Sequence, residues 1–216
     1  MICNVIATGS GGNCVILDDL LAIDMGVPYK LIEPYVRALR LVLLTHIHGD
    51  HFNPATIRRL HRERPTLRFG CCEWLVRPLL DAGVSPSMID VYSTVSNTAF
   101  NEYDRGRVII LAVPLSHDVE NCGYKICVNN ETAFYATDTG TLDNVSAPGF
   151  DLYMIEANHT EAEIAERIQR KLEAGEFVYE YRAAAGHLSR EKADAWLSRN
   201  ATPGKSRVVY LHGHTE

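Results

Sequence analysis

Short apolar runs bounded by polar and glycine-rich turns recur along the chain and predict β-strands. Two such runs, at residues 5–7 and 14–17, flank the segment Gly9-Ser10-Gly11-Gly12-Asn13, which indicates a strand, a turn and a second strand. Several further β-rich runs lie within residues 88–113, with a turn expected at Arg105-Gly106. The remaining predicted strands cover residues 20–23, 41–44, 66–69, 124–128, 132–136, 152–156 and 208–211.

Apolar residues at helical spacing lie between these strands and predict helices. The predicted helices cover residues 28–39, 54–62, 73–81, 161–172 and 189–197, the last with Ser189 as its N-cap. Asn129-Asn130 joins two predicted strands and is typical of a hairpin turn, because asparagine tolerates a left-handed backbone. Strands followed by helices in each half favour an α+β fold, in which two sheets pack face to face with helices outside.

The composition fits a single folded domain over residues 1–216. With 46% hydrophobic residues, the chain can bury a substantial core. It begins without the basic stretch and apolar run of a secretory signal, and no segment is apolar for long enough to cross a bilayer. We therefore expect a cytoplasmic protein whose six cysteines are thiols.

The formal net charge of −6 argues against a general nucleic-acid binder, because non-specific binding depends on basic side chains that displace phosphate counterions. Bound divalent cations can supply positive charge at the position of one phosphate. An acidic protein that binds metal can therefore still cleave phosphodiesters.

Three histidines and an aspartate crowd the segment Thr45-His46-Ile47-His48-Gly49-Asp50-His51, directly after a predicted strand. Imidazole and carboxylate groups are the ligands that suit zinc, manganese or iron in hydrolytic sites. In an extended segment His46 and His48 project together, and a turn at Gly49 lets Asp50 and His51 converge on a neighbouring point. The segment therefore predicts ligands for two metals.

Further ligand candidates follow predicted strands elsewhere in the chain. His117 follows the run 108–115, Asp138 follows residues 132–136, and His212 follows residues 208–211. Strand ends are where rigid scaffolds present catalytic groups. His214, two residues beyond His212, is an alternative for the last ligand.

This order of residues, His-x-His-x-Asp-His, a later His, Thr-Asp after a strand and a late His, resembles the metallo-β-lactamase superfamily. The resemblance implies an αββα sandwich of two packed mixed β-sheets flanked by helices. Further motifs resemble the YycJ/WalJ family of exonucleases, and the pairing of Glu-Ala with Gly-His is similar to tRNase Z. These motifs are Gly9-Ser10-Gly11-Gly12-Asn13, Ala22-Ile23-Asp24-Met25-Gly26, Ser116-His117-Asp118, Ala136-Thr137-Asp138-Thr139-Gly140, Glu156-Ala157-Asn158-His159 and Gly186-His187-Leu188-Ser189.

The resemblance also implies a set of metal ligands. His46, His48 and His117 would bind one divalent ion, and Asp50, His51 and His212 would bind a second. Asp138 would bridge the two ions, and Asp24 would orient a ligand histidine. Zinc or manganese is expected, with iron as an alternative.

The resemblance further implies hydrolysis of a phosphodiester by a hydroxide that two metals share. Asp50, Glu156 and His187 are the expected catalytic residues. His187 would donate a proton to the leaving oxygen or bind the scissile phosphate, and Glu156 would hold its imidazole in orientation.

Several alternatives remain open at this level. The expected substrate is nucleic acid, with single-stranded DNA favoured and RNA or a small phosphodiester as alternatives. A thioester, lactone or β-lactam hydrolase keeps the same fold, and a non-catalytic metal-binding protein is a third reading. The sequence does not decide between a monomer and a homodimer. A group of arginines is either a basic edge for a nucleic-acid strand or a solvated helix face, namely Arg58, Arg59, Arg62, Arg64 and Arg68.

Overall fold

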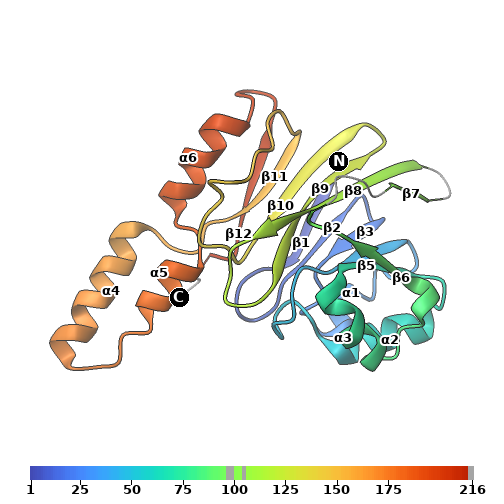
Figure 1. Ribbon diagram of the computed structural model, residues 1–216, viewed down its shortest axis with the longest axis horizontal. Helices are drawn as coiled ribbons and strands as arrows, with labels where there is room; N and C mark the ends of the chain where they lie inside the picture. The colour runs from blue at the N-terminus through green and yellow to red at the C-terminus, as the bar shows by residue number, and fades with distance from the viewer. Residues whose placement is uncertain (96–99, 104–105, 214–216) are drawn as a thin grey trace.

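The computed structural model describes residues 1–95, 100–103 and 106–213 and contains two six-stranded mixed sheets, packed face to face (Figure 1). The first sheet has the order β1 (Cys3–Ala7), β2 (Cys14–Leu17), β3 (Leu21–Ile23), β4 (Leu41–Leu43), β5 (Arg68–Cys72) and β6 (Ile89–Tyr92). The second has the order β12 (Arg207–Leu211), β11 (Leu152–Glu156), β10 (Glu131–Ala136), β9 (Asn121–Val128), β8 (Gly106–Leu115) and β7 (Phe100–Tyr103). This arrangement confirms the expected sandwich.

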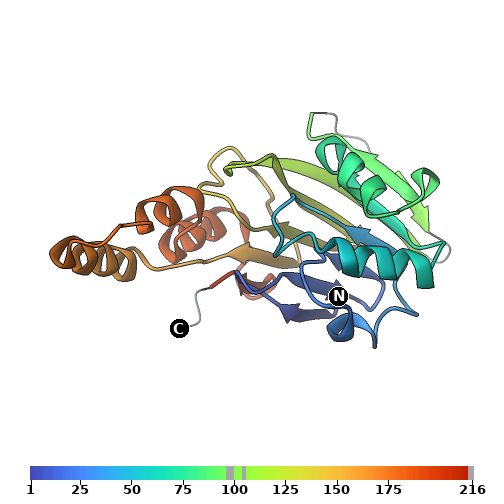
Figure 2. The same ribbon diagram turned by 90° about the horizontal axis from the view of Figure 1, so that it is seen from below.

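Helices cover the outer faces of both sheets. On the first sheet lie α1 (Tyr29–Ile32), α2 (Pro54–Glu63) and α3 (Val76–Asp81), and α6 (Arg190–Asn200) packs on the second. Short 3₁₀ turns at Glu73–Leu75 and Pro86–Met88 flank α3. The helices α4 (Glu161–Ala174) and α5 (Glu180–Gly186) form an arm that extends beyond the sheets (Figure 2). Among the described residues, no helix is both long and apolar enough to span a membrane.

The central strands are apolar on both faces because each face meets a different layer. In β2, Val15 and Leu17 face the second sheet, whereas Cys14 and Ile16 face the helices of the first. A continuous apolar run is the expected pattern for a strand covered on both sides. This explains why the sequence shows short unbroken runs rather than alternation.

The predicted helix at residues 28–39 is wrong in extent, because only Tyr29–Ile32 is α-helical and turns follow it. Pro34 has no N–H for the bond to the carbonyl four residues earlier, and its ring crowds that carbonyl. The α5 helix was not predicted, although Ala183-Ala184-Ala185 favours helix. The hairpin at Asn129-Asn130 is confirmed, with left-handed φ values of 51° and 70°. The turn expected at Arg105-Gly106 lies partly outside the described residues.

A buried tyrosine connects the second sheet to the end of β4. Tyr124 of β9 is fully buried, and its hydroxyl donates a hydrogen bond to the Leu44 carbonyl oxygen at 2.5 Å.

We expect Tyr124→Phe to lower the free energy of unfolding by about 1–3 kcal/mol, because the buried carbonyl loses its donor. Urea denaturation measures this change. Tyr35→Phe is the matched control and should change stability by less than about 0.5 kcal/mol, since Tyr35 is only half-buried. Equal effects of the two substitutions would contradict this account.

Candidate metal centre

The histidine-rich segment leaves β4 and places two imidazoles beside a third from the second sheet. His46 Nε2 lies 3.2 Å from His48 Nδ1, and His117 Nε2 lies 3.3 Å from the same His48 atom. His117 follows β8, so the two sheets both contribute to this group. The predicted first ligand set is therefore brought together.

A second group forms next to the first. Asp50 Oδ2 lies 3.6 Å from His51 Nε2 and 3.7 Å from His212 Nε2. His212 follows β12 at the edge of the second sheet. The predicted second ligand set is also brought together, while the alternative ligand His214 lies outside the described residues.

Asp138 lies between the two groups. Its Oδ2 atom is 3.5 Å from His46 Nε2 in the first group and 2.5 Å from His51 Nε2 in the second. The carboxylate is nearly fully buried. Its position is that of a residue shared by two adjacent cation sites.

The donor atoms fit divalent metal ions. Ligand nitrogens that are each about 2.0–2.1 Å from a tetrahedral ion stand roughly 3.3 Å apart, close to the spacing within the first group. His212 Nε2 is buried and has no hydrogen-bond partner, and the buried Asp138 Oδ2 faces the ring nitrogens of His46 and His51. Buried polar atoms are rarely left unsatisfied, so His212 Nε2 points to a missing partner. The residues form four overlapping groups that could hold a metal ion, namely His46-His48-His117, His46-His51-Asp138, Asp50-His51-His212 and Asp138-Glu156-His187-His212.

Burial and charge act in opposite directions on the central histidines. Burial opposes the charge on His51, but the carboxylates of Asp24 and Asp138 outweigh it and raise the pKa of His51 to about 10. Burial, with His51 nearby, lowers the pKa of His46 to about 3. Burial also works against the charge of Asp138, yet hydrogen bonds from His187 and His51 hold its pKa well below the usual range. A metal ion that binds here must displace protons, as ligand binding at such sites generally does.

Asp24 orients His51, as the sequence predicts. Its Oδ2 accepts from His51 Nδ1 at 2.7 Å and from the Tyr135 hydroxyl at 2.9 Å. Its Oδ1 accepts from the Thr45 amide at 3.0 Å and the Thr45 hydroxyl at 2.9 Å. Because Asp24 occupies Nδ1, His51 presents Nε2 to the site.

Sequence reasoning did not assign a role to Asn13, which the structure places against the second group. Its amide nitrogen Nδ2 lies 3.2 Å from Asp50 Oδ2 and 2.8 Å from His51 Nε2. Its side-chain oxygen accepts from the Gly9 amide at 2.9 Å. The Gly-Ser-Gly-Gly-Asn loop therefore positions Asp50. The loop motif can be read from the sequence, but the sequence does not show that the folded loop lies next to Asp50.

Gly26 allows the segment that carries Asp50 and His51 to pack closely against it. A Cβ atom at this position would lie only 1.6 Å from the Asp50 carbonyl oxygen. Any larger residue would therefore displace the chain that carries Asp50 and His51.

Three residues of the site adopt a left-handed backbone within two residues of the ends of their strands. The φ values are 58° at Asp24, 53° at Asp138 and 57° at His212. Such conformations are uncommon outside glycine and concentrate at functional sites. The turn at each strand end directs the side chain inward.

Glu156 and His187 form the contact that the sequence predicts. His187 Nδ1 lies 2.6 Å from Glu156 Oε1, and the same oxygen lies 3.0 Å from His212 Nδ1. The Thr139 and Leu188 amides donate to Glu156 Oε2 at 3.0 and 3.1 Å. Burial opposes the charge on His187, but Asp138 and Glu156 raise its pKa to about 10.

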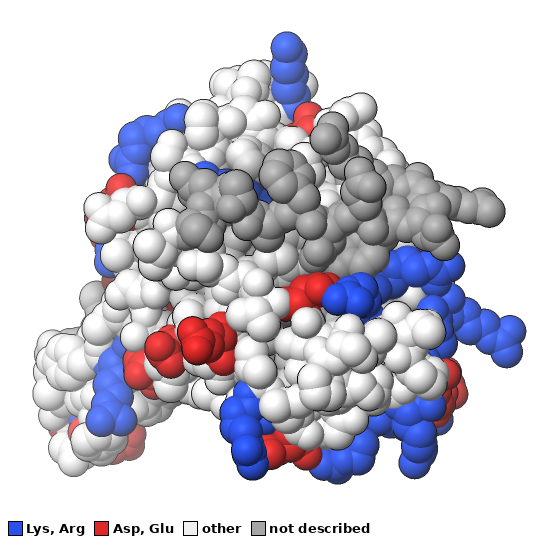
Figure 3. Space-filling view, turned by 45° about the vertical axis from the view of Figure 1, so that its right-hand side comes forward, with Lys and Arg blue, Asp and Glu red and all other residues white. Residues whose placement is uncertain are grey.

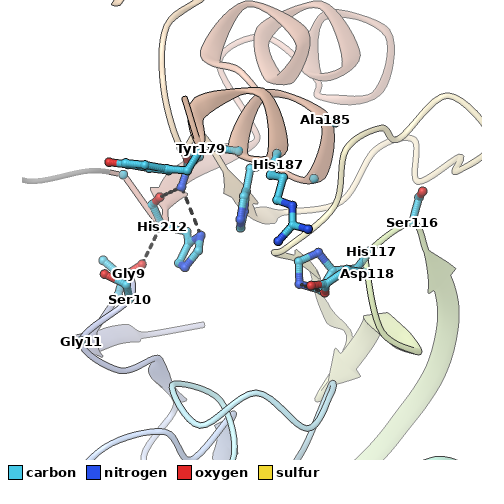
Figure 4. A pocket seen from close by; sticks show the side chains of 16 residues that line it. Gly9, Ser10, Gly11, Ser116, His117, Asp118, Tyr179, Ala185, His187 and His212 are labelled. Atoms are coloured by element: carbon cyan, nitrogen blue, oxygen red, sulfur yellow. Dashed lines mark hydrogen bonds and ion pairs between the residues drawn. The ribbon is translucent and has the colours of Figure 1, made fainter. Parts of the chain in front are cut away.

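An open pocket of about 920 Å³ leads to these residues. Figure 4 shows Tyr179 and His187 on the α5 side and Gly9, Ser10 and Gly11 across the pocket. His212 and His117 also line it, so the pocket reaches both candidate ion sites.

The arginines near α2 are largely engaged in holding the fold. Arg59 pairs with Glu63 at 2.8 Å, Arg64 donates to the Arg37 carbonyl oxygen at 2.7 Å, and Arg68 pairs with Asp90. Figure 3 shows Lys and Arg side chains gathered at the lower right, with Asp and Glu among them. None of these arginines lines the pocket.

Comparisons with known proteins agree with the fold. A family model described as "Beta-lactamase superfamily domain" matches residues 23–212. No curated protein sequence matches the chain significantly. The structure of human tRNase Z, short form, matches with a TM-score of 0.68 and 14% sequence identity, and the match covers 100% of this chain and 93% of the tRNase Z chain. A diphosphatase from the PhnP family has a TM-score of 0.60, 16% identity, and coverage of 98% and 85%. Zn(2+)-bound PqqB from Methylobacterium extorquens has a TM-score of 0.64, 14% identity, and coverage of 99% and 89%.

We expect Asp24→Asn to weaken metal binding by about 10- to 100-fold, because His51 loses the carboxylate that orients it. Competition with a chromophoric chelator measures the affinity. Asp19→Asn, an exposed control that also has a left-handed backbone, should leave the affinity unchanged. Metal affinity that survives Asp24→Asn would show that His51 needs no such support.

Proposed function

This chain belongs to the family of beta-lactamase superfamily domains, and from that premise we propose that it is a hydrolase of phosphodiesters that uses two divalent metal ions. His46, His48 and His117 would hold one ion, Asp50, His51 and His212 the other, and Asp138 both. This assignment follows the two groups of converging donor atoms. When bound, the ions would supply Lewis acidity, which lowers the pKa of water and offsets negative charge at phosphorus. Zinc or manganese suits these ligands, with iron as the alternative.

The contact between Glu156 and His187 carries the preference for phosphodiesters. His187 Nδ1 lies against Glu156 Oε1 and is also 3.2 Å from Asp138 Oδ1. With Nδ1 occupied, the imidazole has Nε2 left for a substrate in the pocket that His187 lines. Without bound ions, Asp138 and Glu156 raise the pKa of His187 to about 10, which favours the protonated ring that a proton donor requires. An alkoxide leaving group needs that proton.

The remaining residues of this group hold the donor in place. Glu156 is fully buried, and its second oxygen is fixed by two backbone amides. Its first oxygen contacts both His187 and His212, so the proton donor and a proposed ligand share one support. Asp50 would be a ligand of the second ion, and its negative charge would also contribute to the electrostatics of the reaction site. The Glu156 contact would thus align His187 with the bound substrate.

We propose a strand of DNA as the substrate and exonucleolytic cleavage as the reaction, with RNA as the alternative. The pocket is open and reaches both candidate ion sites, which suits a chain end. The names of two structural relatives, a tRNase Z and a diphosphatase, denote hydrolysis at phosphorus. Hydrolysis of a thioester, lactone or β-lactam is the competing activity, and it does not require the Glu156–His187 pair.

Metal removal should abolish activity, because the ions supply the Lewis acid. We expect purified protein to contain about two metal ions per chain by elemental analysis, and chelator treatment to eliminate cleavage of single-stranded DNA. Addition of Mn²⁺ or Zn²⁺ should restore cleavage. A thioester and a β-lactam tested in parallel should remain intact. Full activity of the metal-free protein would refute the proposal, and turnover of the thioester alone would favour the competing activity.

His187→Ala should reduce cleavage of a thymidine dinucleotide by about 10²–10⁴-fold, because the alkoxide leaves without a proton. Bis-p-nitrophenyl phosphate should be affected less, since nitrophenolate leaves readily unprotonated. Metal content by elemental analysis should stay unchanged. His61→Ala is the control, because it removes a histidine near the end of α2 that contacts Ser85. Equal losses on both substrates would assign His187 to phosphate binding rather than proton donation, and loss of metal would make it a ligand.

A further inference from the structure

We propose that Tyr179 and Arg182 form a subsite for the nucleotide next to the scissile phosphate, in which Arg182 binds the neighbouring phosphate and Tyr179 stacks on a base. This inference rests on the proposed phosphodiesterase function. Both residues line the pocket that His187 and His212 also line. The subsite therefore adjoins the site of cleavage without belonging to the ligand set.

The short α5 helix forms one wall of the pocket and leads directly into the proton donor. It ends at Gly186, immediately before His187. Tyr179 precedes the helix, and the Arg182 amide donates to the Tyr179 carbonyl oxygen at 2.9 Å, so the two residues are one turn apart. Figure 4 shows Tyr179 on this wall, facing Gly9 and Ser10 across the pocket. A strand bound at His187 would extend along α5.

Arg182 is the only lysine or arginine among the described residues that line the pocket. Within the described part of the chain, no acidic side chain pairs with it, and its side chain is exposed. Some other surface arginines are paired with acidic neighbours, for example Arg77 with Asp81 and Arg190 with Asp194, both at 3.0 Å. An unpaired guanidinium in a pocket is well suited to bind a phosphate through two parallel hydrogen bonds.

The distribution of charge gives the substrate a direction. Across the pocket from α5, the Gly9-Ser10-Gly11 segment presents no charged side chain, and the carboxylate among the lining residues is that of the exposed Asp118. A second phosphate is repelled by Asp118 and attracted by Arg182. The neighbouring phosphate therefore belongs on the α5 side.

Tyr179 is held as a fixed platform by the arm. Lys171 of α4 places its Nζ 3.7 Å from the centre of the Tyr179 ring and 2.8 Å from Glu180 Oε1. Glu180 is buried, so this pair fixes α5 against α4. Tyr179 remains 49% exposed, which leaves ring surface open to the pocket. Bases of any kind stack on such a ring, because each presents a π-face.

The test compares a thymidine trinucleotide, which has two phosphates, with the dinucleotide, which has one. Arg182→Ala should raise KM for the trinucleotide by roughly 10- to 100-fold, the effect expected for a charge-assisted hydrogen bond. It should raise KM for the dinucleotide much less, so the preference for the longer substrate disappears. Arg182→Lys should restore part of the preference, because it keeps the charge without the paired geometry.

Tyr179→Ala should raise KM for both oligonucleotides by roughly 5- to 100-fold relative to its effect on bis-p-nitrophenyl phosphate, which has no base. Tyr179→Phe keeps the ring and should behave like the wild type. The matched controls are Arg170→Ala and Tyr181→Ala, which remove an arginine and a tyrosine from the same arm outside the pocket. Neither control should change KM.

Calorimetric titration of the metal-loaded His187→Ala protein with each oligonucleotide provides a measurement independent of turnover. Tighter binding of the trinucleotide, lost on adding Arg182→Ala, would support the subsite. Equal affinity for both oligonucleotides, or an Arg182→Ala loss of the same size on every substrate, would overturn it. Absence of any cleavage by the wild type would instead contradict the proposed function, so the two failures are distinct.

Discussion

The buried carboxylate of Asp24 is the group on which the sandwich and the site both depend. It follows β3, accepts two hydrogen bonds from Thr45 at the end of β4, one from Tyr135 of the second sheet and one from His51. A buried charge is strongly unfavourable unless it is paired and hydrogen-bonded. Asp24 is fully satisfied only when both sheets and the His51 loop are in their native positions. Its burial therefore couples the packing of the sheets to the geometry of the ligands.

The same coupling explains the concentration of unfavourable features at one end of the sandwich. Asp24, Asp138 and His212 all adopt left-handed backbones, and two of their buried polar atoms face the candidate ion sites: Asp138 Oδ2, which lies beside His51 Nε2, and His212 Nε2, which has no hydrogen-bond partner. Each feature lowers the stability of a protein that has no metal. Divalent ions would satisfy these atoms and neutralise the clustered carboxylates, so binding and folding would stabilise each other. Before ions bind, the rigid core between the sheets would hold these residues in position.

The sequence predicted the parts of the site that depend on local order. His46, His48, Asp50 and His51 lie within one segment, and Asp138 and His212 each follow a strand, so the strand pattern was sufficient to place them. The strand pattern does not predict contacts between segments that are far apart in the sequence. The packing of Asn13 on Asp50 depends on a loop closing over residues far along the chain. The α5 helix was missed because its position depends on the ion pair between Lys171 and the buried Glu180 rather than on apolar periodicity.

The proposed metal ligands and the proposed substrate subsite lie on different elements of this molecule. The proposed ligands follow strands of two packed sheets, where a displacement would disturb the core. The α5 wall is attached to α4 by local contacts on an arm outside the sheets (Figure 2). Changes on that wall can alter the pocket while the strand ends remain in place. A common fold can thus accommodate different substrates, which is why likeness of fold alone does not determine what such a protein hydrolyses. For this chain, the proposed function places the selective contacts where His187 adjoins Tyr179 and Arg182 in the lining of one pocket.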